Sequence, residues 1–329
     1  MYQQREQLLE KYELTVKEIS KGRGTVIADT DRGRVVLKEY HGSEERVGAL
    51  AQVLAYLKGW DGRTEQLLAD REGNYLVTDE EGHRYILKTG VFGRECDTGN
   101  AGEVLAAAKK LASFHIALLE CREPGMEIFR NPEHDFAGEV RRHNRELRCV
   151  RNYVSRKKKK NAFEELFWSC FPGYFAQAQD VAEIYPAGEQ TAGACCLCHG
   201  DYNQHNVIEC RSNPCIINLE QMRWDEPVGD LAKFLRKVLE KNSWRQDLGL
   251  SMIRAYDGIR PLEEGERQKL FLRLAYPARF WNVANHYYNS RKAWVSQRDI
   301  EKLRGLLEVE NQRKEFLKIL YKSGERSKI

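Results

Sequence analysis

A polar loop framed by short apolar runs is the feature that most constrains the fold of this chain. The loop extends from His199 through Asp201 to Asn206, with the spacing H-x-D-x-x-x-x-N. Residues 195–198 before it and 206–209 after it are β-prone, which predicts a strand, a polar loop and a second strand. The carboxylate of Asp201 therefore belongs to neither a helix nor a strand, and it is placed to reach a bound molecule.

Length and composition favour a globular protein with two lobes or two domains. The chain has 329 residues, enough for a large core, and its net charge of +4 gives no sign of nucleic-acid binding. No run approaches the roughly 18 apolar residues that span a bilayer, and the first residues lack the apolar core of a signal peptide. Nine cysteines at irregular spacing favour free thiols. We therefore expect a cytoplasmic protein without membrane contact.

The first ninety residues are rich in β-prone segments. Residues 14–19, 25–29 and 34–40 predict three antiparallel strands, and residues 75–78 and 84–88 predict a further hairpin. Between them, an apolar stripe with helical spacing follows a serine that can cap a helix. We therefore expect residues 1–89 to form a small antiparallel-sheet lobe with one packed helix.

From about residue 99 the apolar spacing becomes helical almost to the end of the chain. Pro172 and Gly173 predict a break within the helical residues 135–185, and Pro227 and Pro261 predict boundaries of later helices. Residues 90–329 are therefore expected to form a larger, mainly helical lobe that also carries the polar loop. The fold class predicted for the whole chain is α+β, with two lobes.

The residues of the polar loop suit phosphoryl transfer. That reaction needs a base for the acceptor hydroxyl, a metal that neutralises phosphate charge and a cradle for the phosphates. Asp201 is the candidate base, and Asn206 offers its amide oxygen as a metal ligand. His199 is expected to brace the loop through hydrogen bonds. The alternatives are a solvated loop aspartate and an asparagine that only forms a turn.

Lys38 and a short glycine turn are the candidate contacts for ATP. Side chains alternate along a strand, so Val36 and Lys38 share a face, which places an apolar residue under the adenine and an ammonium group at the phosphates. Gly22 and Gly24 lie in the turn between the first two strands, where they are candidates to cover the phosphates. An ordinary strand end and an ordinary hairpin turn are the alternatives. The nearest candidate ion-pair partners of Lys38 are Glu44 and Glu45, which lie in the first turn of the following helix.

Asn218 raises the question of whether magnesium can bind. It lies near the end of a third β-prone run, residues 215–219, where such a site normally offers an aspartate. An amide oxygen has no charge, whereas Mg²⁺ prefers anionic oxygens, and even outer-shell losses lower metal affinity or activity roughly 10–100-fold. If the strand continues, Glu220 faces the same side and can compensate; otherwise Glu220 faces solvent. Asn206, Asn218 and Glu220 are the candidate metal ligands.

Two further clusters have simpler interpretations. Cys195, Cys196 and Cys198 lie on a predicted strand with no second pair at zinc spacing, so we expect them to be packing residues. The five basic residues 156–160 are expected to form a solvated helix end or loop, and a patch for an acidic partner is the alternative.

Several of these features resemble known families. The loop, Lys38 and the order of a β-rich part before a helical part resemble the aminoglycoside phosphotransferase and choline kinase-like branch of the protein-kinase-like fold. Closer similarity to the spore coat CotS family is carried by four segments, at residues 93–96, 111–115, 146–153 and 198–201. The resemblance covers about residues 12–320.

The resemblance implies a nucleotide bound between two lobes, with residues 88–93 as the hinge. Carried over by position, it implies that Asp201 is the base, Asn206 a metal ligand and Lys38 the phosphate contact, with ATP and Mg²⁺ as cofactors. It also implies association with sporulation, including incorporation into the spore coat beside other coat proteins.

Two hypotheses for the function follow. In the first, the chain is an ATP-dependent phosphotransferase for a small hydroxyl-bearing molecule, since nothing after Glu220 resembles the activation segment used for protein substrates. In the second, it is a catalytically weak or inactive kinase-fold scaffold of the spore coat, a hypothesis favoured by Asn218.

Overall fold

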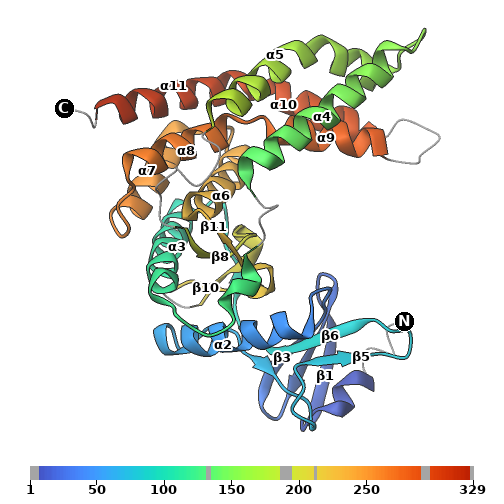
Figure 1. Ribbon diagram of the computed structural model, residues 1–329, viewed down its shortest axis with the longest axis vertical. Helices are drawn as coiled ribbons and strands as arrows, with labels where there is room; N and C mark the ends of the chain where they lie inside the picture. The colour runs from blue at the N-terminus through green and yellow to red at the C-terminus, as the bar shows by residue number, and fades with distance from the viewer. Residues whose placement is uncertain (1–6, 131–134, 186–194, 211–212, 290–296, 327–329) are drawn as a thin grey trace. The chain divides into compact units, whose positions relative to one another are not determined.

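The structure is a computed structural model that describes residues 7–130, 135–185, 195–210, 213–289 and 297–326 (Figure 1). The chain divides into two compact units. The first consists of Met1–Asn131 and Cys196–Trp224, and the second of Pro132–Cys195 and Asp225–Ile329. None of the helices in the described ranges has the length and apolar character needed to cross a bilayer.

A six-stranded antiparallel sheet forms the beginning of the first unit and confirms the predicted strands. Its strands, in spatial order, are β1 (Val16–Lys21), β2 (Thr25–Thr30), β3 (Gly33–Glu39), β6 (Arg84–Thr89) and β4 (Leu67–Leu68), while β5 (Leu76–Thr78) also pairs with β6. The sheet ends at Thr89, which is also the end of the predicted small lobe. That lobe boundary stays a prediction, because the first compact unit continues beyond it.

The two faces of this sheet differ in what they carry. One face buries Val26, Val35 and Leu87 against the short helix η1 (Leu8–Lys11). On the other face the register pairs Val36 with Lys88 and Lys38 with Ile86. Since cross-strand partners share a face, both lysines point to the same side.

The single helix predicted for this lobe is α2 (Glu44–Trp60). The Oγ of Ser43 accepts a hydrogen bond from the Arg46 amide at 3.2 Å, so the predicted cap is present. Val47 packs with Ile86, which places α2 on the same sheet face as the lysines. Arg46 also donates to the carbonyl oxygen of Met222. This hydrogen bond ties the start of α2 to the turn that follows the β-prone residues 215–219.

The rest of the first unit places the polar loop between short strands. Its remaining elements are β7 (Arg94–Glu95), α3 (Ala101–Glu120), η2 (Met126–Phe129), β8 (Cys196–Cys198), η3 (Gln204–Asn206), β9 (Val207–Glu209), β10 (Cys215–Ile216), η4 (Leu219–Gln221) and β11 (Arg223–Asp225). Strands β10, β9 and β7 form one small sheet, and β11 pairs with β8. The loop therefore begins at the end of one short strand and leads into another, as predicted.

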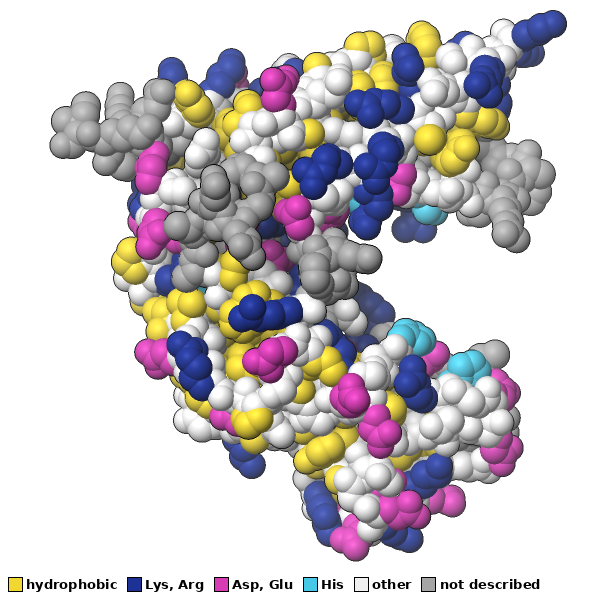
Figure 2. All heavy atoms as spheres, viewed as in Figure 1, with side chains coloured by type: hydrophobic (Ala, Val, Ile, Leu, Met, Phe, Trp, Pro, Cys, Tyr) yellow, Lys and Arg dark blue, Asp and Glu magenta, His cyan; other side chains and the backbone are white. Residues whose placement is uncertain are grey.

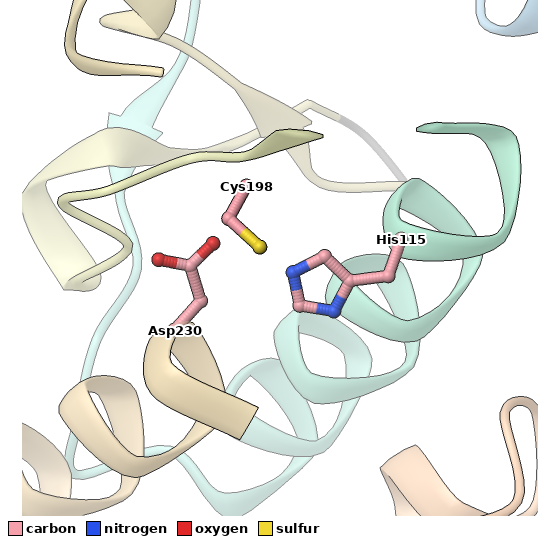
Figure 3. Close-up of side chains that lie close together, drawn as sticks. All are labelled: His115, Cys198 and Asp230. Atoms are coloured by element: carbon pink, nitrogen blue, oxygen red, sulfur yellow. The ribbon is translucent and has the colours of Figure 1, made fainter. Parts of the chain in front are cut away.

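The cysteines of β8 are packing residues. Cys196 and Cys198 are buried free thiols whose sulfur atoms lie 3.9 Å apart. Figure 3 shows the Cys198 thiol directed toward the ring of His115, which comes from α3. Asp230, also drawn in Figure 3, lies in the first turn of α6 in the second unit.

The second unit is helical in its described residues. Its helices are α4 (Phe136–Ser155), α5 (Ala162–Ile184), α6 (Pro227–Lys241), α7 (Gln246–Asp257), α8 (Glu264–Ala275), α9 (Ala278–Asn289), α10 (Gln297–Glu308) and α11 (Glu310–Arg326). Helices α4, α5, α9 and α10 share one core, in which the rings of Phe167 and Phe280 stack at 5.5 Å. On the face drawn in Figure 2, many Lys and Arg side chains lie over these helices.

The predicted break at Pro172 is wrong, because α5 continues through it. Proline inside a helix costs about 3 kcal/mol. Phe163, Phe167, Phe171 and Tyr174 recur at helical spacing on both sides of Pro172, and all are buried in the same core. Their packing outweighs the cost of the proline. The boundaries predicted at Pro227 and Pro261 are confirmed, since α6 begins at Pro227 and Pro261 separates α7 from α8.

A buried carboxylate joins three helices of the second unit. Glu226 directly precedes α6, and its carboxylate accepts from Arg273 of α8 at 2.7 Å and from the Tyr185 hydroxyl after α5 at 2.6 Å. It also pairs with Lys269 of α8. Burial opposes its ionisation, but Arg273 and then Lys269 and Tyr185 outweigh burial and lower the pKa of Glu226 to about 2.

We predict that this carboxylate makes the fold acid-sensitive. A folded-state pKa below the unfolded value gives stability that is fully present above about pH 4.5 and is lost as the pH falls toward 2. Glu226→Gln should lower the free energy of unfolding at pH 7 by about 3 kcal/mol, and it should flatten the pH dependence in that window. Urea unfolding followed by circular dichroism measures both. The exposed pair Glu315–Lys318 provides the control Glu315→Gln, which should change little; equal losses in the two variants would contradict the prediction.

Candidate active site

The polar loop is held in one conformation by His199. The amide of Asp201 donates to Nδ1 of His199 at 3.2 Å, so this nitrogen is the acceptor and Nε2 carries the proton. Nε2 then donates to the carbonyl oxygen of Ile217 at 3.0 Å. The ring is fully buried, and it braces the loop as predicted.

Gly200 allows the loop to approach the turn after β10. Its φ is +80°, and a Cβ atom built on it would lie 2.3 Å from the carbonyl oxygen of Gln221. Only glycine combines this backbone conformation with such a close approach. The loop carrying Asp201 is thereby fixed against the turn that carries Glu220.

Three of the predicted site residues form a hydrogen-bonded row. Nδ2 of Asn206 donates to the backbone oxygen of Asp201 at 2.8 Å and to its Oδ2 at 3.3 Å. Nδ2 of Asn218 in turn donates to Oδ1 of Asn206 at 2.7 Å. The candidate base and two candidate metal ligands thus lie side by side, although they come from separate segments.

The strand predicted for residues 215–219 ends early, at Ile216. Asn218 has φ 64° and ψ 45°, a left-handed conformation that asparagine tolerates, and η4 begins directly after it. The strand therefore does not continue to Glu220, and alternation along a strand does not decide which side this residue faces. The alternative that Glu220 faces solvent is wrong, because this residue is 5% exposed.

Lys38 contacts Glu220 rather than the first turn of α2. Its Nζ donates to Oε1 of Glu220 and, at 3.3 Å, to Oδ1 of Asn218. The short helix after Asn218 turns the chain back on itself, which brings Glu220 to the same ammonium group as the asparagine. Lys38 is therefore anchored at the predicted metal ligands.

Lys88 and Glu65 complete the site and were not predicted as site residues. Both are 3% exposed, and Nζ of Lys88 lies 3.1 Å from Oε2 of Glu65 and 3.0 Å from Oε2 of Glu220. Lys88 also donates to Oδ1 of Asn218 at 2.9 Å. Oε1 of Glu65 accepts from the Leu219 amide at 2.9 Å. The sequence signal was a lysine that follows three apolar residues of a predicted strand. The register that pairs this lysine with Val36 comes from the structure.

We call Lys38, Glu65, Lys88 and Glu220 the charge cluster. Burial opposes the ionised form of Glu220, but Lys88 and then Lys38 outweigh it and lower the pKa of Glu220 to about 2. Burial also opposes the charge of Lys88, and Glu65 and Glu220 outweigh it and raise the pKa of Lys88. Both groups are therefore charged at neutral pH.

The donor set can be tested against the chemistry of Mg²⁺. Oδ1 of Asn206 accepts from Asn218, and Oδ1 of Asn218 accepts from both lysines. Glu220 is the only carboxylate among the three candidate ligands, and each of its oxygens already contacts an ammonium group. Mg²⁺ prefers several oxygen ligands with anionic charge. In this arrangement the donor set does not fit a tightly bound Mg²⁺.

The glycine turn closes the hairpin of β1 and β2, as predicted. The Gly22 amide donates to the carbonyl oxygen of Thr25 at 3.0 Å, and Gly24 has a φ of 72°. Between them, Arg23 lies 3.8 Å from Glu95, and the other oxygen of Glu95 contacts His205 of the polar loop. Glu95 therefore links the hairpin tip to the loop, a contact that the sequence did not indicate.

Comparison with solved structures identifies the fold. An aminoglycoside phosphotransferase from Alicyclobacillus acidocaldarius subsp. acidocaldarius DSM 446 superposes with a TM-score of 0.81 at 19% identity, covering 97% of this chain and 95% of that one. Spectinomycin phosphotransferase APH(9)-Ia superposes with a TM-score of 0.67 at 12% identity, covering 96% and 98%. The chain has the bilobal kinase-like fold of these proteins, which confirms the predicted fold class.

Sequence comparison identifies the family. Spore coat protein S of Bacillus subtilis (strain 168) is 30% identical over 123 residues, which are 37% of this chain. The match spans about a third, 35%, of that relative's length. The family model described as "Spore coat putative kinase YutH" matches residues 5–320. Because this match covers nearly the whole sequence, the chain belongs to that spore coat kinase family.

Proposed function

We propose that this chain is a phosphotransferase that moves the γ-phosphate of ATP to a small molecule carrying a hydroxyl group. The proposal rests on the row of Asp201, Asn206 and Asn218 beside Lys38. Two proteins of similar structure support the proposed classes of ligand, a nucleotide and a small molecule. Spectinomycin phosphotransferase was solved with ADP and spectinomycin, and amicoumacin kinase with AMP-PNP, Ca²⁺ and Ami.

In the proposed reaction the acceptor oxygen attacks the γ-phosphorus, the bond from phosphorus to the bridging oxygen breaks, and ADP leaves. The carboxylate of Asp201 takes the hydroxyl proton. Asn206 orients that carboxylate by donating to its Oδ2 and to the backbone carbonyl oxygen of Asp201. When ATP binds, the ammonium group of Lys38 leaves Glu220 and contacts the phosphates, and Gly22 and Gly24 cover these phosphates. We assign no step to Mg²⁺, for which Asn206, Asn218 and Glu220 are the candidate ligands.

A second candidate function is a structural component of the spore coat with little or no catalysis. The neutral amide of Asn218 and the lysine-paired Glu220 favour it. The family supports association with the spore coat. In this proposal the chain is made in the cytoplasm and joins other coat proteins through its kinase-like fold.

Nucleotide binding is tested by thermal shift. ATP at 100 times its dissociation constant should stabilise the protein by about 2.7 kcal/mol. Lys38→Met should abolish the shift because it removes the phosphate contact, whereas Lys58→Met, at an exposed position of α2, should leave it unchanged. The titration is run with EDTA and again with Mg²⁺ or Mn²⁺. No shift in any of these conditions would exclude ATP binding and leave the structural candidate.

Asn218→Asp tests the metal site. A carboxylate at this position adds the missing anionic ligand, so ATP turnover with Mg²⁺ should rise at least about tenfold. Asp201→Ala should abolish turnover both in the natural background and with Asn218→Asp. Radiolabelled ATP with small hydroxyl compounds gives the measurement. If only the Asn218→Asp protein turns over ATP, the natural chain is not an enzyme, and the structural candidate is supported.

The charge cluster should be a strong determinant of stability. Glu65→Gln leaves Lys88 buried beside one fewer carboxylate, and it should lower the free energy of unfolding by about 3–5 kcal/mol. Lys88→Met should lower the free energy of unfolding by a similar amount, because it leaves the buried carboxylate of Glu65 without its ammonium partner. The double variant should lose clearly less than the sum, since both charges are removed together. Urea unfolding of the three proteins measures this coupling, and strictly additive losses would show that the pair is not coupled.

A further inference from the structure

The second unit contains a basic hollow of about 370 Å³ between α6, α9 and α10. Its lining includes Arg236 and Lys237 of α6, Arg279 and His286 of α9, and Lys302 of α10. Residues 236 and 240 lie one helical turn apart, so Glu240 also faces the hollow. Cationic side chains from three helices therefore converge on one space.

The cations of the basic hollow exceed the carboxylates that pair with them. Arg236 and Arg279 share Glu240, at 3.9 Å and 3.2 Å. Lys302 pairs with Asp299 at 3.1 Å, and this carboxylate also lies 3.3 Å from His286. Two carboxylates therefore face four permanent cations, an excess of two positive charges.

Lys237 is the cation that gains least from this pairing. No ion pair of Lys237 occurs among the described residues. Burial lowers its pKa, and Arg236, Arg279 and Lys233 lower it further, while Glu240 acts in the opposite direction. A half-buried ammonium group held among other cations destabilises the protein unless an anion approaches it.

A second hollow of about 250 Å³ adjoins the basic one. The two share Arg236, Glu240, Arg279 and Lys302 in their linings. The rest of the second hollow's lining includes the aromatic rings of Tyr174, Trp244, Tyr276 and Phe280. Glu301 and the ion pair of Arg313 with Glu310 also border it. One ligand can therefore place an anionic group among the cations and a carbon skeleton against the rings.

We propose that these adjoining hollows bind a small phosphate ester with an aromatic or otherwise apolar body. A phosphate monoester carries close to two negative charges at neutral pH, which matches the excess of two positive charges. Guanidinium groups suit phosphate because their donors form a planar fork, and both Arg236 and Arg279 provide one. This site is separate from the residues proposed for phosphoryl transfer, and it does not depend on that proposal.

Calorimetric titration of the full chain with phenyl phosphate tests the proposal. Three control compounds are titrated in the same way. Methyl phosphate lacks the aromatic ring, phenol lacks the phosphate group, and inorganic phosphate has no organic body. Phenyl phosphate should bind most tightly, and its affinity should fall as salt increases. Lys237→Gln and Arg279→Gln should each weaken it at least about tenfold. Lys241→Gln, at an exposed position of the same helix, should not change it.

The stability of the ligand-free variants separates a binding role from a structural one. Lys237→Gln removes a cation that has no ion pair among the described residues, so it should raise the melting temperature, whereas loss of a structural lysine would lower it. Absence of phenyl phosphate binding, or equal affinity in the Lys237→Gln and Lys241→Gln proteins, would overturn the proposal. Binding of inorganic phosphate as tight as that of phenyl phosphate would overturn the apolar part.

Discussion

The first unit depends on one buried contact, that between Lys88 and the two carboxylates of Glu65 and Glu220. The ammonium group lies in the sheet, Glu65 follows α2, and Glu220 is 132 residues away from Lys88 in sequence. A buried charge without partners costs several kcal/mol, so each of these segments must return to the same point in the folded chain. Through the bond from the Leu219 amide to Glu65, the same contact also fixes the turn that holds Asn218.

This contact explains why an amide at position 218 is compatible with a stable site. The charge cluster contains two lysines and two glutamates, so its formal charges balance. A carboxylate at position 218 would be a third negative group at the same two lysines, an excess that a divalent cation could neutralise. Asn218 instead accepts hydrogen bonds from both ammonium groups and adds no charge. The neutral amide of Asn218 therefore suits a site in which Lys38 and Lys88 are already balanced by two glutamates.

The features that could be predicted from the sequence are those that depend on residues close together along the chain. Alternation and turn residues located the strands of the small lobe, and the spacing of His199, Asp201 and Asn206 located the loop. The partners of Lys38 could not be predicted in this way, because the sheet register and the left-handed turn at Asn218 bring Glu220 to it across 182 residues. The continuous helix α5 was missed for a related reason. Phe171 and Tyr174 pack in a core that includes helices far away in the sequence, and this packing overrides the local effect of Pro172.

The two units treat buried positive charge in opposite ways. In the charge cluster each ammonium group contacts a carboxylate, and the pKa of Lys88 is raised. In the basic hollow the pKa of Lys237 is lowered, because burial and neighbouring cations outweigh the opposing effect of Glu240. Repulsion of this kind weakens the fold, and a dianion from solution would relieve it. Charge balance within the protein therefore accounts for the first cluster, whereas the proposed anion would balance the second.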